Sequence, residues 1–132
     1  MSFLLDTDTC SAYLKGNRLV GNRFLQYTGG LHVSAVTMGE LYTWALRAAA
    51  SPKRLQSVQE LLSDLTVLDV THDVARKFGE LRAARFDRGL PPPEMDLLIA
   101  ATALVHDFTV VTHNTKDYAD VPGLRVTDWL VP

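Results

Sequence analysis

Four acidic residues could carry out chemistry together if the fold brings their side chains to one place. They are Asp6, Glu40, Asp96 and Asp117. Carboxylates that are held close together repel one another, and their pKa values rise unless a cation neutralises the charge. Magnesium and manganese ions prefer oxygen ligands, keep several waters, and can bridge phosphate oxygens while activating a water for attack. These residue types therefore predict a divalent-metal site that acts on phosphate groups.

The positions of the acids along the chain indicate that they meet. In open α/β sheets, ligands bind outside the carboxyl ends of the strands. Asp6 ends the first expected strand, and Ser34 ends the second, with Glu40 further along the helix that follows. Asp96 begins a strongly apolar segment, in which a carboxylate has no packing role. The oxygen-bearing residues at the end of the apolar strand near the C-terminus are Thr112, Asn114 and Asp117.

Each acid also has a purely structural interpretation. Asp6 and Asp96 are suited to cap the helices that follow them, and Asp117 is suited to shape a turn. Glu40 stands three residues after Thr37, which is the spacing of a capping box at the start of a helix. The joint placement of the acids at strand ends favours a functional site over these separate roles.

Composition narrows the class of protein. The chain has 132 residues, 47% of them hydrophobic and 21% charged, which is typical of one globular domain over residues 1–132. No apolar run is long enough to span a bilayer and the start lacks the pattern of a signal peptide, so we expect a cytoplasmic protein without a membrane partner. The single cysteine, Cys10, is expected to be a buried hydrophobic side chain. The four histidines are scattered, which excludes a zinc site of the usual kind.

Positive charge is concentrated in the middle of the chain, although the net charge is −2. Between residues 73 and 88, five bases face three acids. Arg82 and Arg85 share one face of an expected helix, where they could contact the phosphates of a polyanion. The alternative is a solvated helix face on which these bases pair with Glu80 and Asp87.

Hydrophobic periodicity and turn residues predict the elements that position these side chains. Strands are expected at 3–5, 31–34, 66–70, 108–112 and 124–127. Helices are expected from 7 to about 15, at 19–27, from Thr37, from Pro52, around 74–84 and at 96–105. Strands separated by helices indicate an α/β fold with a mostly parallel sheet covered on both sides, which is a three-layer α/β/α sandwich.

Four segments in series resemble the four motifs of PIN domains, and most closely those of the single-domain VapC-type toxins of bacterial toxin–antitoxin pairs. The segments are Leu4-Leu5-Asp6-Thr7-Asp8 and residues 34–41, 96–103 and 111–118. The resemblance extends to the tail at 121–126 and so covers nearly the whole chain. Any one of these motifs is weak, whereas four in order at ordinary spacing are specific.

The resemblance implies a PIN-like sandwich and an endoribonuclease that hydrolyses RNA phosphodiester bonds by two-metal-type catalysis with Mg²⁺ or Mn²⁺. The catalytic set that it implies is Asp6, Glu40, Asp96 and Asp117, with Asp6, Asp96 and Asp117 as the metal ligands. The polar supports that it implies are Thr112 and Asn114. It also implies a cognate VapB-type antitoxin and commonly a homodimer, and it makes RNA the polyanion that Arg82 and Arg85 would contact.

Two positions and two alternative functions stay open. Asp8 stands where PIN domains commonly have Asn, and Glu94 is an extra acid beside the third motif, so either residue could join the site. The run Asp6-Thr7-Asp8 is also similar to the acid pair of haloacid-dehalogenase-like phosphotransferases, although Cys10 departs from that pattern. The alternative without catalysis is a PIN-like module that binds RNA or protein and does not cut.

Overall fold

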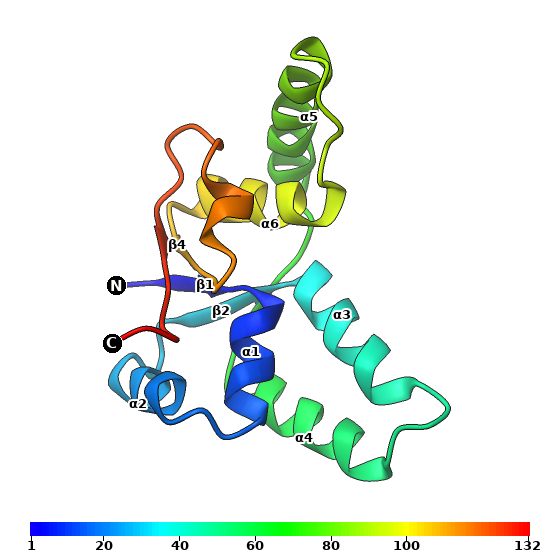
Figure 1. Ribbon diagram of the computed structural model, residues 1–132, viewed down its shortest axis with the longest axis vertical. Coiled ribbons are helices and arrows are strands. Elements are labelled where there is room, and N and C mark those ends of the chain that lie inside the picture. The colour runs from blue at the N-terminus through cyan, green and yellow to red at the C-terminus, as the bar shows by residue number, and fades with distance from the viewer.

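The computed structural model describes residues 1–132 and contains a five-stranded sheet with helices on both faces (Figure 1). The strands are β1 (Phe3–Leu5), β2 (Leu31–Ser34), β3 (Thr66–Leu68), β4 (Thr109–Val111) and β5 (Val126–Thr127). The helices are α1 (Thr7–Leu14), α2 (Arg18–Gln26), α3 (Ala35–Leu46), α4 (Pro52–Ser63), α5 (His72–Asp87), α6 (Glu94–His106) and the short 3-10 helix η1 (Thr115–Tyr118). None of them has the length and apolar character that crossing a bilayer requires.

The order of the strands creates one point at which the chain reverses its direction across the sheet. The order is β3-β2-β1-β4-β5, and every neighbouring pair is parallel. The chain adds β2 and β3 on one side of β1 and then returns to add β4 and β5 on the other side. The residues that follow β1 and β4 therefore lie at the reversal point, where open α/β sheets bind their ligands.

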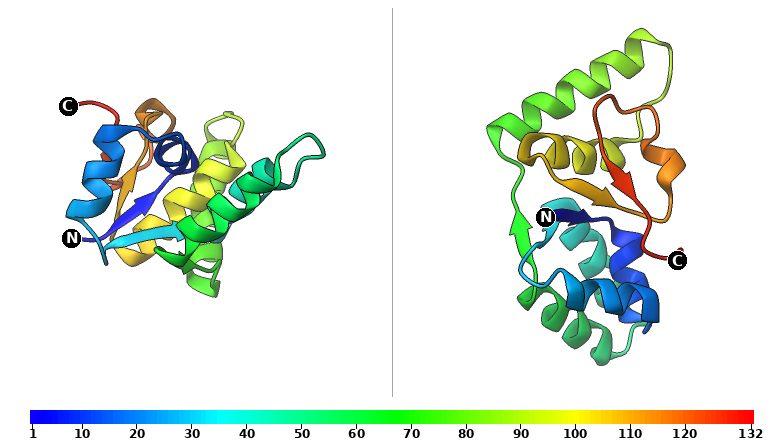
Figure 2. Two further views of the ribbon diagram at one scale, coloured as in Figure 1. Left: turned by 90° about the horizontal axis from the view of Figure 1, so that it is seen from below. Right: turned by 90° about the vertical axis from the view of Figure 1, so that its left-hand side faces the viewer.

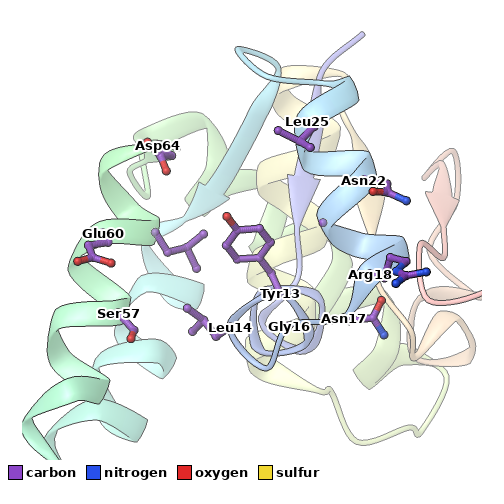
Figure 3. Close-up of a pocket in the computed structure, with 12 residues that line it drawn as sticks. Tyr13, Leu14, Gly16, Asn17, Arg18, Asn22, Leu25, Ser57, Glu60 and Asp64 are labelled. Carbon is purple, nitrogen blue, oxygen red and sulfur yellow. The ribbon is translucent and has the colours of Figure 1, made fainter.

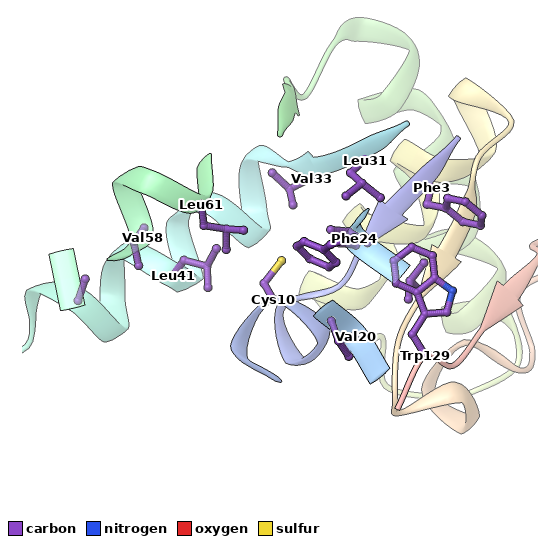
Figure 4. Packing of buried hydrophobic residues seen from close by; sticks show 13 residues of the cluster. Phe3, Cys10, Val20, Phe24, Leu31, Val33, Leu41, Val58, Leu61 and Trp129 are labelled. Carbon is purple, nitrogen blue, oxygen red and sulfur yellow. The ribbon is translucent and has the colours of Figure 1, made fainter. Parts of the chain in front are cut away.

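Alternate side chains of the buried strands face two separate cores. Phe3 and Leu5 point toward the face covered by α1, α2, α3 and α4, where Trp129 packs edge-on against Phe3 with ring centres 5.0 Å apart (Figure 4). Leu4 points to the opposite face, which α6 covers and against which α5 packs in turn. Figure 2 shows these two helical layers on opposite sides of the strands. The three-layer α/β/α sandwich predicted from the sequence is confirmed.

Two helices begin earlier than predicted, and both differences change the interpretation of an acid. Ser34 caps α3, because its hydroxyl accepts a hydrogen bond from the backbone N–H of Thr37 at 3.2 Å. The capping box predicted at Thr37 is therefore wrong, and Glu40 lies in the second turn of α3 instead of in the cap. The helix α6 begins at Glu94, so Asp96 lies within its first turn and does not cap it.

Candidate active site

Asp6 is the only acidic residue of the chain that is buried, with 8% of its surface exposed. It follows β1 directly and accepts a hydrogen bond from the backbone N–H of Thr7 at 2.8 Å, as a cap of α1. Its other carboxylate oxygen accepts bonds from the hydroxyls of Thr112 at 2.9 Å and Tyr118 at 3.1 Å. Burial and the nearby charge of Asp8 outweigh these bonds and raise the pKa of Asp6 to about 6. The reversal point thus holds a carboxylate whose charge is only partly compensated.

Asp8 anchors the turn that follows β4. Its Oδ2 accepts hydrogen bonds from the backbone N–H groups of His113 at 3.0 Å and Asn114 at 3.2 Å, and from the Asn114 side-chain amide at 3.1 Å. The hydroxyl of Thr112 lies between the carboxylates of Asp6 and Asp8, 3.3 Å from the same Oδ2. Thr112 therefore contacts Asp6, whereas the side chain of Asn114 contacts Asp8 and not the carboxylate of any of the four acids singled out in the sequence.

Glu40 reaches from α3 to the first residue of α1. Its Oε1 accepts a short hydrogen bond, 2.6 Å, from the hydroxyl of Thr7. The backbone N–H of the same threonine donates to Asp6. Thr7 therefore ties the half-buried carboxylate of Glu40 to the end of β1, so that two strand ends, those of β1 and β2, deliver acids to one place.

Asp96 and Asp117 lie at a cleft between the start of α6 and η1. The cleft has a volume of about 270 Å³, and its lining residues are Arg85, Pro93, Asp96, Lys116, Asp117 and Asp120. Burial raises the pKa of Asp96, and the charges of Asp117, Glu40 and Asp8 raise it further. These carboxylates are therefore within electrostatic range of one another. Together with Asp6 they form what we call the acidic cluster, whose members are Asp6, Asp8, Glu40, Asp96 and Asp117.

Glu94 does not join the acidic cluster. Its two carboxylate oxygens each lie 2.9 Å from Nε of Arg82, at the surface between α5 and α6. The guanidinium of Arg82 also lies over the ring of Phe86, 4.8 Å from its centre. The alternative partners predicted for the bases of this helix face, Glu80 and Asp87, are not the ones that Arg82 uses.

Arg85 differs from Arg82 because it belongs to the wall of the cleft beside Asp96. Its guanidinium pairs with Asp120 and donates to the carbonyl oxygen of Pro91 at 2.8 Å. Only 20% of the side chain is exposed, and the buried Nε has no hydrogen-bond partner. Arg85 is thus a fixed positive group next to the acidic cluster.

The residues of the acidic cluster fit a hard divalent cation that keeps part of its water shell. No group of three His, Cys, Asp or Glu side chains lies close enough together to hold one ion directly. Mg²⁺ is commonly bound through only one or two carboxylates with several waters, so wider spacing suits it. A cation here would also relieve the burial and repulsion that raise the pKa values of Asp6 and Asp96.

Tyr118 was missed by the sequence reasoning. Its ring is 2% exposed, and its hydroxyl lies 3.1 Å from Oδ2 of Asp6 and 3.5 Å from Oδ1 of Asp96. Burial raises the pKa of Tyr118, and the charges of Asp6 and Asp96 raise it further, so the hydroxyl is a neutral donor. The available signal was a phenol directly after Asp117 in the turn that leads the chain back toward the sheet.

A second concave surface lies away from the acidic cluster, between α1, α2 and α4 (Figure 3). This groove has a volume of about 710 Å³, and none of the five clustered acids lines it. Figure 3 shows Tyr13 and Leu25 on one side and the acids Glu60 and Asp64 of the α4 side on the other. Leu25 lines this groove and is 79% exposed, so it offers an apolar contact to a partner.

The sequence is similar to known proteins over nearly its whole length. Residues 3–124 match the family described as PIN domain. The tRNA(fMet)-specific endonuclease VapC of Salmonella typhimurium is 32% identical over 130 residues, which are 98% of each chain. Ribonuclease VapC2 of Haemophilus influenzae is 30% identical over 131 residues, which are 98% of this chain and 99% of the relative.

Solved structures of VapBC proteins contain chains with the same fold as this one. The crystal structure of DNA-bound VapBC from Salmonella typhimurium contains a chain with a TM-score of 0.91 and 32% identity, and the match covers 98% of both chains. VapBC2 of Rickettsia felis, solved with a DNA fragment from its promoter, gives a TM-score of 0.90 at 25% identity over 98% of this chain and 99% of that one. The likeness therefore extends over the whole sandwich, including every element that carries a clustered acid.

The pKa of Asp6 predicts how the stability of the metal-free protein depends on pH. The folded state holds this proton up to about pH 6, whereas an unfolded aspartate releases it near pH 3.9. Between these values the folded state binds more protons, so the free energy of unfolding should rise as the pH falls, by up to about 3 kcal/mol from this residue. Urea unfolding in chelator at about pH 7 and about pH 5 brackets the folded pKa and should show about 1 kcal/mol of this change.

The variant Asp6→Asn should lose this part of the pH dependence, because an amide does not titrate. Asp87→Asn, at an exposed position at the end of α5, is the matched control and should keep the wild-type dependence. Equal pH dependence in wild type and Asp6→Asn would show that Asp6 does not carry the raised pKa.

Proposed function

The chain belongs to the PIN domain family, and we propose that it is an endoribonuclease that depends on a divalent metal ion and acts as the toxin of a VapBC-type pair. The observation that carries the proposal is the acidic cluster at the reversal point of the sheet. Its carboxylates come from elements that are far apart in sequence, and burial raises the pKa of Asp6 and Asp96. The relatives named ribonuclease or endonuclease VapC match this chain over 98% of its length, which supports the same activity here.

We propose that Asp6, Asp96 and Asp117 hold the metal ion, in part through its water shell because the three do not lie close enough to bind one ion directly, with Glu40 as the fourth member of the catalytic set. The oxygen-only donor set favours Mg²⁺ or Mn²⁺. When bound, such an ion polarises the phosphodiester and makes a coordinated water more acidic. The chain's own contribution is placement: Thr7 holds Asp6 through its N–H and Glu40 through its hydroxyl, while Thr112 donates to Asp6.

RNA phosphates are proposed to bind along the cleft beside Asp96. Arg85 and Lys116 line this cleft, and their positive charge would attract the RNA backbone on either side of the bond that is cut. The ion pair with Asp120 supports this role for Arg85, because it holds the guanidinium in one orientation. Arg82 has weaker support, because it does not line this cleft and pairs with Glu94 at the surface.

The alternatives raised by the sequence are less well supported. Both carboxylate oxygens of Asp6 accept hydrogen bonds from the protein, which does not suit the exposed nucleophile of a haloacid-dehalogenase-like phosphotransferase. A module that only binds RNA would gain nothing from gathering mutually repelling acids. The homodimer and the cytoplasmic location stay predictions.

We propose that the groove between α1, α2 and α4 binds the cognate antitoxin. The solved relatives are VapBC complexes, so they contain this kind of toxin with its partner. The groove offers apolar contacts through Leu25 and the partly exposed Leu14, with Glu60 and Asp64 along the α4 side. An amphipathic helix with apolar residues on one face and basic residues beside them is the partner that these features fit.

The first prediction of the proposed function concerns RNA cleavage. Purified protein should cut RNA with Mg²⁺ or Mn²⁺, stop in chelator, and leave a 5′-phosphate and a 3′-hydroxyl, because the acidic cluster has no histidine pair to use the 2′-hydroxyl. Asp96→Asn should lower kcat by about 100-fold or more, since it removes a proposed metal ligand. Total RNA and initiator tRNA are the substrates to test, the second because of the name of the Salmonella relative.

Asp87→Asn is the control for this measurement and should cleave like wild type, since its side chain is exposed and outside the acidic cluster. Cleavage that continues in chelator, or products that end in a cyclic phosphate, would contradict the metal-dependent reaction. Cleavage at the wild-type rate by Asp96→Asn would remove that residue from the site.

The second prediction concerns the groove. Leu25→Asp should weaken the complex with the antitoxin encoded beside this chain's gene, because it places a charged group that must lose its water at the apolar contact. RNA cleavage by the free variant should be unchanged, since the groove contains none of the clustered acids. Calorimetric titration of toxin with antitoxin measures the affinity.

Leu46→Asp is the matched control, because Leu46 is 65% exposed at the end of α3 and does not line the groove. We expect its antitoxin affinity to stay at the wild-type value. Wild-type affinity of Leu25→Asp would contradict the proposed position of the antitoxin.

A further inference from the structure

Tyr118 is the one side chain whose hydroxyl lies within hydrogen-bond distance of two of the four proposed catalytic acids, and its single proton can be donated to either of them. Its hydroxyl lies 3.1 Å from Oδ2 of Asp6 and 3.5 Å from Oδ1 of Asp96. These two acids come from different elements of the fold. Asp6 follows β1, and Asp96 lies in the first turn of α6. The hydroxyl therefore stands at the junction between the sheet and the helical layer that carries Asp96.

The rest of the tyrosine is fixed by packing. The side chain is 2% exposed and belongs to the core beneath α6, with Leu4, Leu97 and Val121. A ring held in this way has little freedom to turn, so its hydroxyl occupies a defined point between the two carboxylates. The packing of the ring in the core therefore fixes the position of the hydroxyl beside the acidic cluster.

The hydrogen bonds determine which carboxylate oxygens stay available. Oδ2 of Asp6 accepts from both Thr112 and Tyr118, whereas Oδ1 accepts only from the backbone N–H of Thr7. Oδ1 of Asp96 faces Tyr118, and no protein donor contacts its Oδ2. Each carboxylate therefore has one oxygen turned toward the tyrosine and another with capacity for a further partner.

We propose that Tyr118 is a positioning residue, which orients Asp6 and Asp96 so that their remaining oxygens present a pre-arranged pair to a divalent ion. This inference rests on the proposed function, because it assumes that the acidic cluster binds metal. Partners that hydrogen-bond to metal ligands fix the orientation of those ligands, and losing such a partner typically costs about 10- to 100-fold in metal affinity or activity.

The test replaces Tyr118 with Phe, which keeps the ring and removes the hydroxyl. Titration calorimetry with Mn²⁺ and no RNA should show a dissociation constant about 10- to 100-fold weaker than that of wild type. The Mn²⁺ concentration that half-saturates RNA cleavage should rise by a similar factor, while KM for RNA at saturating Mn²⁺ stays at the wild-type value. Loss of packing alone would not produce this pattern in a folded variant.

Tyr27→Phe is the matched control, since Tyr27 lies in the opposite core beside Phe3 and Trp129. Its hydroxyl bonds to the side chain of Gln26 and to none of the clustered acids. It should bind Mn²⁺ like wild type. Circular dichroism checks that Tyr118→Phe is folded, and Tyr118→Met is a second variant that removes the hydroxyl but fills the space.

The outcomes separate this inference from the proposed function. Wild-type Mn²⁺ affinity in a folded Tyr118→Phe or Tyr118→Met protein would overturn the positioning role and leave the metal site intact. Failure of the wild-type protein itself to bind Mn²⁺ would instead overturn the metal-dependent function, and the role of Tyr118 with it. Weaker binding in the variants, with the control unchanged, supports the positioning role.

Discussion

The structure depends on the burial of one carboxylate, Asp6, at the end of the central strand. A buried carboxylate is costly unless hydrogen bonds or a cation stabilise its charge. Here the helix start, a threonine at the end of the neighbouring strand and a tyrosine from the core all donate to it. The pKa of Asp6 is still raised to about 6, so these donors do not fully compensate the charge. The folded protein therefore contains an unfavourable electrostatic free energy at Asp6, which a bound cation would lower.

The order of the strands places further carboxylates beside Asp6, which adds to this unfavourable energy. β1 and β4 are parallel neighbours, so the residues that follow them meet at one edge of the sheet. The next strand after β1 lies on one side of this pair, and the next strand after β4 lies on the other side. Asp6 and Asp8 follow β1, and Asp117 follows β4. The first turn of α6 adds Asp96 from the adjoining layer. Positive side chains stay at the periphery of this cluster, where Arg85 and Lys116 line the cleft, so the centre is left to the carboxylates.

Asp6 and Asp117 could be found from the sequence because they follow apolar strands, whereas Glu40 and Asp96 lie inside helices and are singled out by their joint placement with the others and by the series of motifs. A carboxylate directly after an apolar run, as at Asp6, marks a strand end, and strand ends of a parallel sheet share one edge. The choice between Ser34 and Thr37 as the cap of α3 could not be made in this way, because both residues are good caps and the two residues between them suit either a loop or the first turn of the helix. The contacts of Tyr118 and the pairing of Arg82 with Glu94 depend on how α5, α6 and η1 pack together. No spacing along the chain encodes that packing.

The central claim is that the acidic cluster is a cation site, and thermal melting of wild type and Asp96→Asn, each in chelator and in Mn²⁺, tests it most directly. An ion that binds only the folded state stabilises it by about 2.7 kcal/mol at a hundredfold excess over its dissociation constant. We expect Mn²⁺ to raise the melting temperature of wild type. Asp96→Asn should be at least as stable as wild type in chelator, because one repulsive charge is gone, and should lose most of the response to Mn²⁺. The same Mn²⁺ response in both proteins would contradict the account.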